Sequence, residues 1–185
     1  MTLLVFFLEE PSAKAMLKGL LPRILADDVY CQYVVFEGKQ DLEKRLPMRL
    51  RAWQIPDSLF VVLRDKDSGN CLEIKQGLVQ KCINAGKPDT LVRIACHELE
   101  SWYLGDLQAV ETGIGSVGLA KKQNNRKYRT PDLLANPAQE LANIAPNYQK
   151  VSGSQLIGLQ LNSKKNRSTS FNFFISGIHR LLNQQ

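Results

Sequence analysis

Two acidic residues follow an apolar run in a pattern that suits metal binding. Residues 59–63 are apolar and rich in β-branched side chains, which predicts a buried strand of a parallel sheet. Asp65 and Asp67 come just after it, and residues two apart in an extended chain point the same way. Adjacent carboxylates repel unless a cation or a proton lies between them, so the spacing predicts a site for Mg²⁺ or Mn²⁺. In the alternative interpretation this is a solvated loop whose charge Arg64 and Lys66 balance.

More acidic residues follow two other apolar runs. Glu9 comes after residues 2–8, and Glu98 and Glu100 come after residues 90–95. The carboxyl ends of parallel strands lie on one edge of a sheet, so these side chains are expected to converge there with the two aspartates. Several carboxylates at one edge are what two-metal phosphoryl chemistry requires.

Glu98 and Glu100 cannot both face one ion from one helix, because they would lie about 200° apart around its axis. Either the helix begins after Glu98, or only one of the two residues binds metal. In the alternative interpretation each is a surface glutamate that the helix dipole favours in the first turn, and Glu98 could also pair with Arg93.

The rest of the chain is predicted to form a scaffold that alternates strands and helices. The predicted strands are residues 2–8, 31–36, 59–63 and 90–95, and the predicted helices are residues 13–25, 41–53, 72–85 and 98–110. This alternation predicts an α/β fold, in which helices flank a Rossmann-like four-stranded parallel sheet through right-handed crossovers. Ser12 is the expected N-cap of the first helix, and Pro22 is expected to kink it.

A change in composition at residues 113–116 predicts a boundary in the chain. Residues 1–110 are expected to form a catalytic core, and residues 111–185 a mainly helical extension packed on it. Further helices are predicted at residues 132–144 and 168–182, whereas residues 155–161 are ambiguous.

The composition is that of a globular protein. Of the 185 residues, 44% are hydrophobic and 23% are charged, and the net charge of +6 leans towards polyanionic partners. The four cysteines form no C-x-x-C pair, which argues against a zinc site and favours a reducing cytoplasm. No apolar run approaches membrane-spanning length, and the first residues are not expected to be a signal peptide.

Four motifs and two further segments give the chain a resemblance to a known family. The motifs are LEEPSAKAxL, VVxEGKxDL, VLRDKD and RIACHELESWYLGD, and the segments are residues 148–150 and 167–171. In these stretches the chain resembles the DUF4276 proteins, which belong with the Toprim-like nucleases. The resemblance covers nearly the whole chain. It implies a Toprim-like core, in which Mg²⁺ supports phosphodiester breakage or formation.

The same resemblance implies roles for particular acidic residues. The general Toprim pattern has a glutamate after the first strand and D-x-D after the third, which correspond here to Glu9, Asp65 and Asp67. Glu100 resembles the glutamate of the glutamate-tryptophan signature in related Toprim families. The sequence departs from the family at Glu10, where glycine is usual. Glu10 would either obstruct the approach of a phosphate or add a ligand.

Basic residues are expected to hold a nucleic acid. Lys39 follows the second strand on the same edge of the sheet and could meet a phosphate. Two clusters later in the chain suit the phosphate backbone of DNA or RNA, and a solvated basic surface is the alternative. The clusters comprise Lys121, Lys122, Arg126, Lys127 and Arg129, with Tyr128 among them, and Lys164, Lys165 and Arg167.

Together these features predict a Mg²⁺-dependent nuclease whose catalytic residues are Glu9, Asp65, Asp67 and Glu100. The resemblance also implies a setting in phage defence with a separate ATPase, since the chain has no G-x-x-x-x-G-K-[ST] motif of its own. Two alternatives stay open. One is a non-catalytic module that docks on an ATPase or on nucleic acid, and the other is a small-molecule phosphatase of doubly wound fold.

Overall fold

The structure, a computed structural model, describes residues 2–183 and contains a four-stranded parallel sheet. In their order across the sheet the strands are β2 (Val29–Val35), β1 (Thr2–Leu8), β3 (Ser58–Asp65) and β4 (Leu91–Ala95). Because all neighbours are parallel, the four strands end together at what we call the carboxyl edge. The predicted α/β fold with a Rossmann-like sheet is confirmed.

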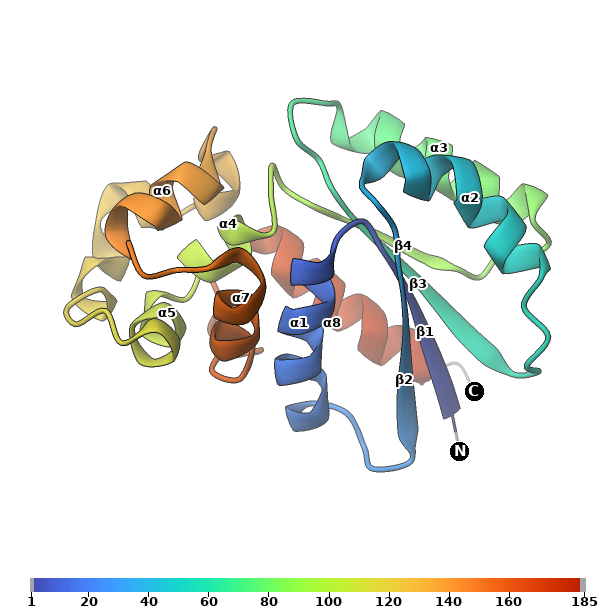
Figure 1. Ribbon diagram of the computed structural model, residues 1–185, viewed down its shortest axis with the longest axis horizontal. Helices are drawn as coiled ribbons and strands as arrows, with labels where there is room; N and C mark the ends of the chain where they lie inside the picture. The colour runs from blue at the N-terminus through green and yellow to red at the C-terminus, as the bar shows by residue number, and fades with distance from the viewer. Residues whose placement is uncertain (1, 184–185) are drawn as a thin grey trace.

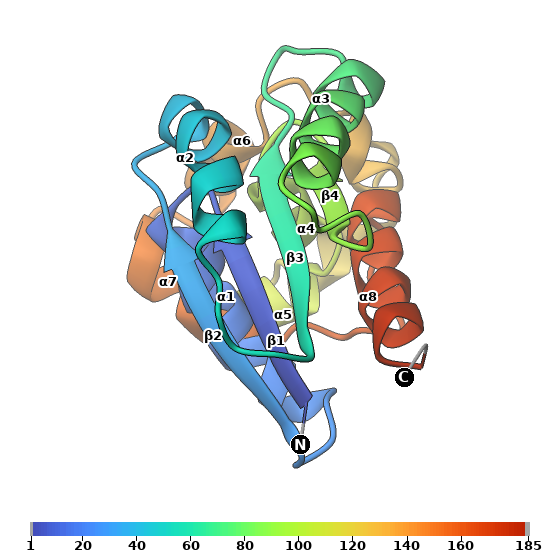
Figure 2. The ribbon, with the colours of Figure 1, turned by 90° about the vertical axis from the view of Figure 1, so that its right-hand side faces the viewer.

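Helices cover both faces of the sheet (Figure 1, Figure 2). One face carries α2 (Lys39–Arg51) and α3 (Cys71–Asn84), and the other carries α1 (Pro11–Leu20) and α8 (Thr169–Leu182). Side chains alternate along a strand, so Phe6 of β1 packs in the core on the α1 face while Phe7 packs in the core on the α2 face. The central strand is therefore buried on both sides.

The chain after β4 forms a helical group beside α1 (Figure 1). The group consists of α4 (Glu100–Leu104), α5 (Leu107–Ile114), α6 (Pro137–Ile144) and α7 (Lys150–Gly158), with short 3-10 turns between α5 and α6. A Cβ added to Gly158 would meet Met16 O at 2.3 Å, and one added to Gly19 would meet Leu159 N at 2.6 Å. The backbones of α1 and α7 therefore approach so closely that only glycine fits between them.

A shared hydrophobic core joins this helical group to the sheet. Trp102 and Tyr103 are fully buried in it. The Trp102 ring lies 5.0 Å from that of Phe174 in α8, and its Nε1 donates a hydrogen bond to Ser170 Oγ at 2.8 Å. The extension predicted over residues 111–185 thus contributes to the same core as the α1 face of the sheet.

The first helix differs from its prediction at both ends. It begins at Pro11 with Glu10 as its N-cap residue, so the predicted cap at Ser12 is wrong. It ends at Leu20, and Pro22 lies in the 3-10 turn Leu21–Arg23 that follows. Proline has no N–H to continue an α-helix, which explains why the helix stops there.

The helix predicted over residues 98–110 is broken in two. α4 begins at Glu100, and α5 has its own N-cap in Asp106, whose side chain accepts a hydrogen bond from Ala109 N at 3.1 Å. Arg167 N donates to Gly105 O at 2.9 Å, which uses a carbonyl that a continuous helix would need. The helix predicted over residues 132–144 begins only at Pro137, and the ambiguous residues 155–161 follow or belong to α7.

Within residues 2–183 no helix is both long and apolar enough to span a lipid bilayer. The four cysteines are free thiols.

Candidate active site

Glu9 and Asp65 lie together at the carboxyl edge, where β1 and β3 end. Glu9 Oε2 accepts a hydrogen bond from the backbone N–H of Asp65 at 3.1 Å, and the Glu9 side chain is 15% exposed. Burial raises the pKa of Glu9, and the bond from Asp65 offsets this only in part. The structure therefore brings together the acidic residues that follow the first and third strands.

The charges of further carboxylates act on Asp65. Asp65 lies two residues beyond Leu63, which packs on the α1 face, so it points to that face as well. Burial raises the pKa of Asp65 well above its usual range, and the charges of Glu10, Glu9 and Glu100 raise it further. We call Glu9, Glu10, Asp65 and Glu100 the acidic group.

Glu100 is the most deeply buried member of the acidic group, with 2% of its surface exposed. Tyr148 Oη donates a hydrogen bond to its Oε1 at 3.1 Å. Burial raises the pKa of Glu100, and the ammonium of Lys150 acts in the opposite direction. Lys150 Nζ also lies 2.6 Å from Glu10 Oε2. The start of α7 thus brings one cation and one phenol to the acidic group.

Asp67 pairs with Lys39 of α2, whereas the extended-chain argument predicted that it would point the same way as Asp65. Its charge still contributes to the raised pKa of Glu9. β3 ends at Asp65, and Asp67 has a φ of 53°, so the alternation of a strand has stopped before it. Asp67 N donates to His97 O at 2.7 Å, which holds this turn against the end of β4. Asp67 Oδ2 accepts a hydrogen bond from Lys39 Nζ at 2.7 Å.

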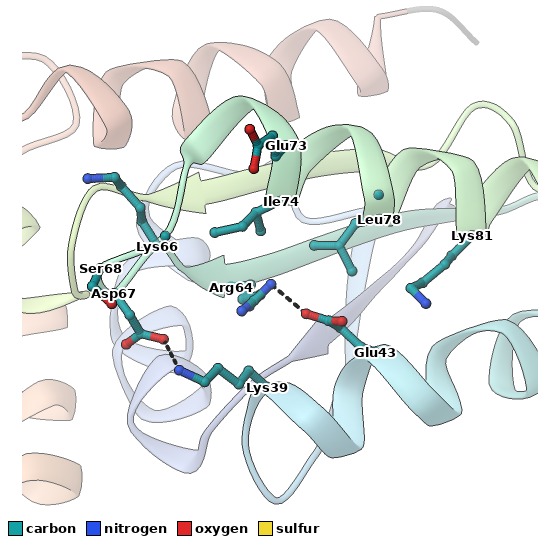
Figure 3. Close-up of a pocket in the computed structure, with 12 residues that line it drawn as sticks. Lys39, Glu43, Arg64, Lys66, Asp67, Ser68, Glu73, Ile74, Leu78 and Lys81 are labelled. Atoms are coloured by element: carbon teal, nitrogen blue, oxygen red, sulfur yellow. Dashed lines mark hydrogen bonds and ion pairs between the residues drawn. The ribbon is translucent and has the colours of Figure 1, made fainter.

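A cavity of about 400 Å³ lies between α2 and α3 next to this turn (Figure 3). Arg64, which is 7% exposed, donates from Nη1 to Glu43 Oε1 at 2.6 Å and has its Nε 3.8 Å from Glu9 Oε2. The guanidinium of Arg64 therefore connects the cavity to the acidic group. Three lysines also line the cavity: Lys39, Lys66 and Lys81.

Glu98 lies just before α4, and its side chain binds the first turn of α6. Its Oε2 accepts a hydrogen bond from the Ala138 N–H at 2.9 Å, in the first turn of α6. The helix begins at Glu100, which agrees with the predicted alternative that it starts after Glu98. Arg93, the predicted partner of Glu98, donates instead to the carbonyls of Val92 and Phe173. Glu98 therefore has a structural role at α6, and Glu100 is the one that joins the acidic group.

The basic residues predicted to bind nucleic acid lie in the 3-10 turns and after α7. Arg167 joins the two clusters, because its guanidinium donates to Gln123 O and Asn124 Oδ1, each at 2.7 Å. Lys127 pairs with Glu140. Tyr128 is buried and donates to the same carboxylate, so its ring is not free to stack on a base. The other basic side chains are exposed: Lys121, Lys122, Arg126, Arg129, Lys164 and Lys165.

The acidic group and its partners all lie within a match to a protein family. The family model described as Domain of unknown function (DUF4276) matches residues 8–179. The chain belongs to the DUF4276 family. No curated protein and no solved structure matches it. The DUF4276 match begins one residue before Glu9 and extends past Lys150 into α8, so it includes every residue of the acidic group.

Two residues at the acidic group, Tyr148 and Lys150, carried no functional prediction. Tyr148 lies 48 residues from Glu100 in the chain, and no local pattern links the two. Their contact depends on the close packing of α7 on α1, which the sequence does not reveal. The one available signal is that residues 148–150 belong to a segment that resembles the DUF4276 family.

The acidic group has the chemistry that a hard divalent cation requires. Its ligands would be carboxylate oxygens, and a cation would relieve the repulsion that, after burial, raises the pKa of Asp65. Within residues 2–183, no three His, Cys, Asp or Glu side chains are arranged as a ready metal site. Glu9, Glu10 and Glu100 each accept a bond from a protein donor. Cation binding would therefore exchange some of these protein contacts for metal contacts.

Proposed function

We propose that this protein is a nuclease that cleaves phosphodiester bonds in DNA or RNA with Mg²⁺ or Mn²⁺ as its cofactor. The observation that carries the proposal is the acidic group, four carboxylates gathered at the carboxyl edge, where ligands bind in open α/β sheets. Carboxylates whose pKa values are raised by burial and by one another are typical of functional sites.

Three members of the acidic group are the proposed cation ligands: Glu9, Asp65 and Glu100. A bound cation would supply an activated water and stabilise the leaving oxygen. Glu9 is also the proposed acid/base, since its raised pKa brings its titration closer to neutral pH. Glu10 is held by Lys150 at 2.6 Å, so the residue that replaces the usual glycine adds a carboxylate whose charge is already matched.

The cavity between α2 and α3 lies on the proposed substrate side. Lysines line it, and ammonium groups neutralise the phosphates of a nucleic-acid backbone. Lys39 and Asp67 form an ion pair at this cavity, and we assign Lys39 to the substrate phosphate (Figure 3). The exposed basic residues at 121–129 and 164–165 are proposed to bind the strand away from the cleaved bond.

Strand cleavage with Mg²⁺ or Mn²⁺, and with EDTA in place of metal, tests the proposal on single- and double-stranded DNA and RNA. We expect the native protein to cleave at least one of these substrates only when metal is present. The Asp65→Asn variant should lose at least about a hundredfold in rate. Asp27→Asn, which removes an exposed carboxylate elsewhere, should cleave at the rate of the parent. Equal rates for Asp65→Asn and the parent would overturn the proposal.

A non-catalytic binding module is the second candidate function. The observation that favours it is that carboxylates at the carboxyl edge are satisfied without a metal: Glu9 by the Asp65 N–H, Glu10 by Lys150, and Asp67 by Lys39. Such a module would dock on nucleic acid or on a separate ATPase. It predicts salt-dependent binding of an oligonucleotide, or capture of the ATPase, with no cleavage under any metal.

We also propose that the protein is Toprim-like and acts in the cytoplasm in defence against phages, with an ATPase as a separate subunit. The position of Glu9 just after β1 and of Asp65 at the end of β3 supports the Toprim assignment. The setting rests on the family resemblance. Phage plating on cells that carry the parent gene with its neighbouring genes, or the Asp65→Asn variant, tests it. The parent should reduce plaque numbers and the variant should not.

A further inference from the structure

A second cavity, of about 690 Å³, lies beside β4. In the part of the chain that the structure describes, β4 pairs only with β3, and α3 and α8 lie on either side of it (Figure 2). No member of the acidic group lines this cavity. Its volume is in the range of cavities that hold small organic ligands. It is therefore a separate candidate site.

Four cationic side chains line the second cavity: Lys75, Arg93, Arg167 and Arg180. Among residues 2–183, none of the four forms an ion pair with an aspartate or a glutamate. Four unmatched positive charges around one cavity attract an anion.

Arg93 is held in position although its charge is not neutralised. Its Nε donates to Phe173 O at 3.0 Å, and its Nη1 donates to Val92 O at 2.9 Å. Burial lowers the pKa of Arg93, and the charge of Arg180 nearby lowers it further. An anion between the two guanidinium groups would relieve their repulsion and bind to an arginine that is already oriented.

Asp132, the acidic side chain in the cavity lining, already accepts hydrogen bonds from the start of α8. Asp132 Oδ1 accepts a hydrogen bond from Ser168 Oγ at 2.6 Å, and its Oδ2 accepts one from Ser170 N at 2.7 Å. These bonds hold the carboxylate at the start of α8. Asp132 keeps its negative charge but forms no ion pair with the arginines, and the four cationic side chains of the lining outnumber it.

Apolar side chains form the other part of the lining. Phe173 and Leu133 are 62% and 78% exposed, although both are large and apolar, and Val92 and Ile94 complete this side. An exposed aromatic ring offers a surface on which a flat ring can stack. A ring next to two arginines suits a ligand that is both planar and anionic.

We propose that the second cavity binds a nucleoside phosphate, with its phosphate at Arg93 and Arg180 and its base on Phe173. This proposal does not depend on the nuclease function, because it uses no residue of the acidic group. A peptide strand added to the open edge of β4 fits less well. Arg93 crosses from β4 to α8 so closely that a Cβ on Gly177 would meet its Nη2 at 2.6 Å, and this blocks the edge.

Calorimetric titration of the full chain in EDTA tests the proposal, since EDTA removes any contribution from a metal in the acidic group. The probes are AMP, adenosine, inorganic phosphate and a single-stranded oligonucleotide. We expect saturable binding of AMP, and binding of adenosine and of phosphate that is each at least tenfold weaker. The variants are Arg180→Ala and Phe173→Ala, with Lys18→Ala as a control that removes one exposed charge from α1.

Arg180→Ala and Phe173→Ala should each weaken AMP binding at least tenfold, and Lys18→Ala should leave it unchanged. Melting temperatures identify any variant that is not folded, and Phe173 is exposed, so its variant should fold. The proposal is overturned if AMP does not bind, if phosphate alone binds as tightly as AMP, or if Lys18→Ala weakens binding as much as Arg180→Ala. Binding of the oligonucleotide without AMP would assign the cavity to a strand and would also overturn it.

Discussion

Asp65 shares its surroundings with three other carboxylates, and this arrangement disfavours its charged form. Burial is the largest cause of its raised pKa, and Glu10, Glu9 and Glu100 add to it. Two cations partly compensate the group: Lys150 forms an ion pair with Glu10, and Arg64 has its Nε 3.8 Å from Glu9 Oε2. Neutralising Asp65 should therefore relieve repulsion in the metal-free protein.

We predict that Asp65→Asn raises the stability of the metal-free protein in EDTA at pH 8, because the amide carries no charge into the acidic group. Melting temperature measures the effect, and Asp27→Asn, which removes an exposed charge, should leave it unchanged. Added Mn²⁺ should raise the melting temperature of the parent but not that of Asp65→Asn. A destabilised Asp65→Asn protein would show that this carboxylate is needed for packing.

The repulsion within the acidic group should also make the stability of the metal-free protein depend on pH. Glu9, Asp65 and Glu100 all have raised pKa values, so the folded state holds protons that the unfolded chain has lost. The stability that these protons contribute is fully present below about pH 4, where the same side chains of the unfolded chain are also protonated. It is lost as pH rises through the pKa values of the folded state. We predict that the metal-free parent loses more stability than Asp65→Asn between pH 5 and pH 8.

Denaturant unfolding at several pH values measures this difference. Asp41 and Glu140 have lowered pKa values, and their contribution is complete above about pH 5, so it does not mask the effect. Parallel curves for the parent and Asp65→Asn over this range would contradict the prediction.

At the scale of single residues, strand ends allowed Glu9, Asp65 and Glu100 to be predicted at one edge, because a parallel sheet aligns its carboxyl ends. For Asp67 the extended-chain argument failed, because the alternation of β3 stops before this residue, which has a positive φ. The charge of Asp67 nevertheless raises the pKa of Glu9. Tyr148 and Lys150 were missed because their contacts arise from helix packing between distant parts of the chain.

At the scale of elements, α6 depends on a carboxylate from another part of the chain. Glu98 Oε2 accepts a hydrogen bond from Ala138 N, whereas the side chain of Asn136, the N-cap residue of α6, accepts none from the helix. We predict that Glu98→Ala lowers the free energy of unfolding by about 1 kcal/mol, as loss of a helix cap does. The affinity for Mn²⁺ should stay the same.

Glu100→Gln is the matched comparison for this experiment. It keeps the size of the side chain and should weaken Mn²⁺ binding, because Glu100 belongs to the acidic group. Thermal melting and a Mn²⁺ titration followed by electron paramagnetic resonance distinguish the two roles. Loss of Mn²⁺ affinity in Glu98→Ala would restore Glu98 as a ligand.

The strands were predictable because apolar, β-branched runs have few alternatives inside a globular protein. The predicted strand over residues 2–8 matches β1, and that over residues 90–95 differs from β4 by one residue. Helices after β4 were less predictable. The break at Gly105 depends on Arg167 N, which lies far along the chain, and the 3-10 turns between α5 and α6 have no apolar period to mark them.

At the scale of the whole molecule, the contact between α1 and α7 should control stability. We predict that Gly158→Ala lowers the free energy of unfolding by about 1–3 kcal/mol, because its Cβ would press on Met16 O. Gly77→Ala in α3 is the matched control, since nothing lies within 4 Å of an added Cβ there. It should stabilise α3 slightly, by about 0.5–1 kcal/mol. Chemical denaturation measures both, and a neutral Gly158→Ala would show that the two helices can separate.

The same contact limits where the protein can change shape. No side chain fits between α1 and α7 at Gly19 and Gly158, so these helices cannot slide past one another without losing their packing. They form a fixed base on one side of Asp65. The opposite side carries the turn around Asp67 and the Lys39 ion pair, which is partly exposed. Under the proposed function, adjustment to an incoming phosphate is therefore expected on the α2 side, while the base keeps Lys150 in place.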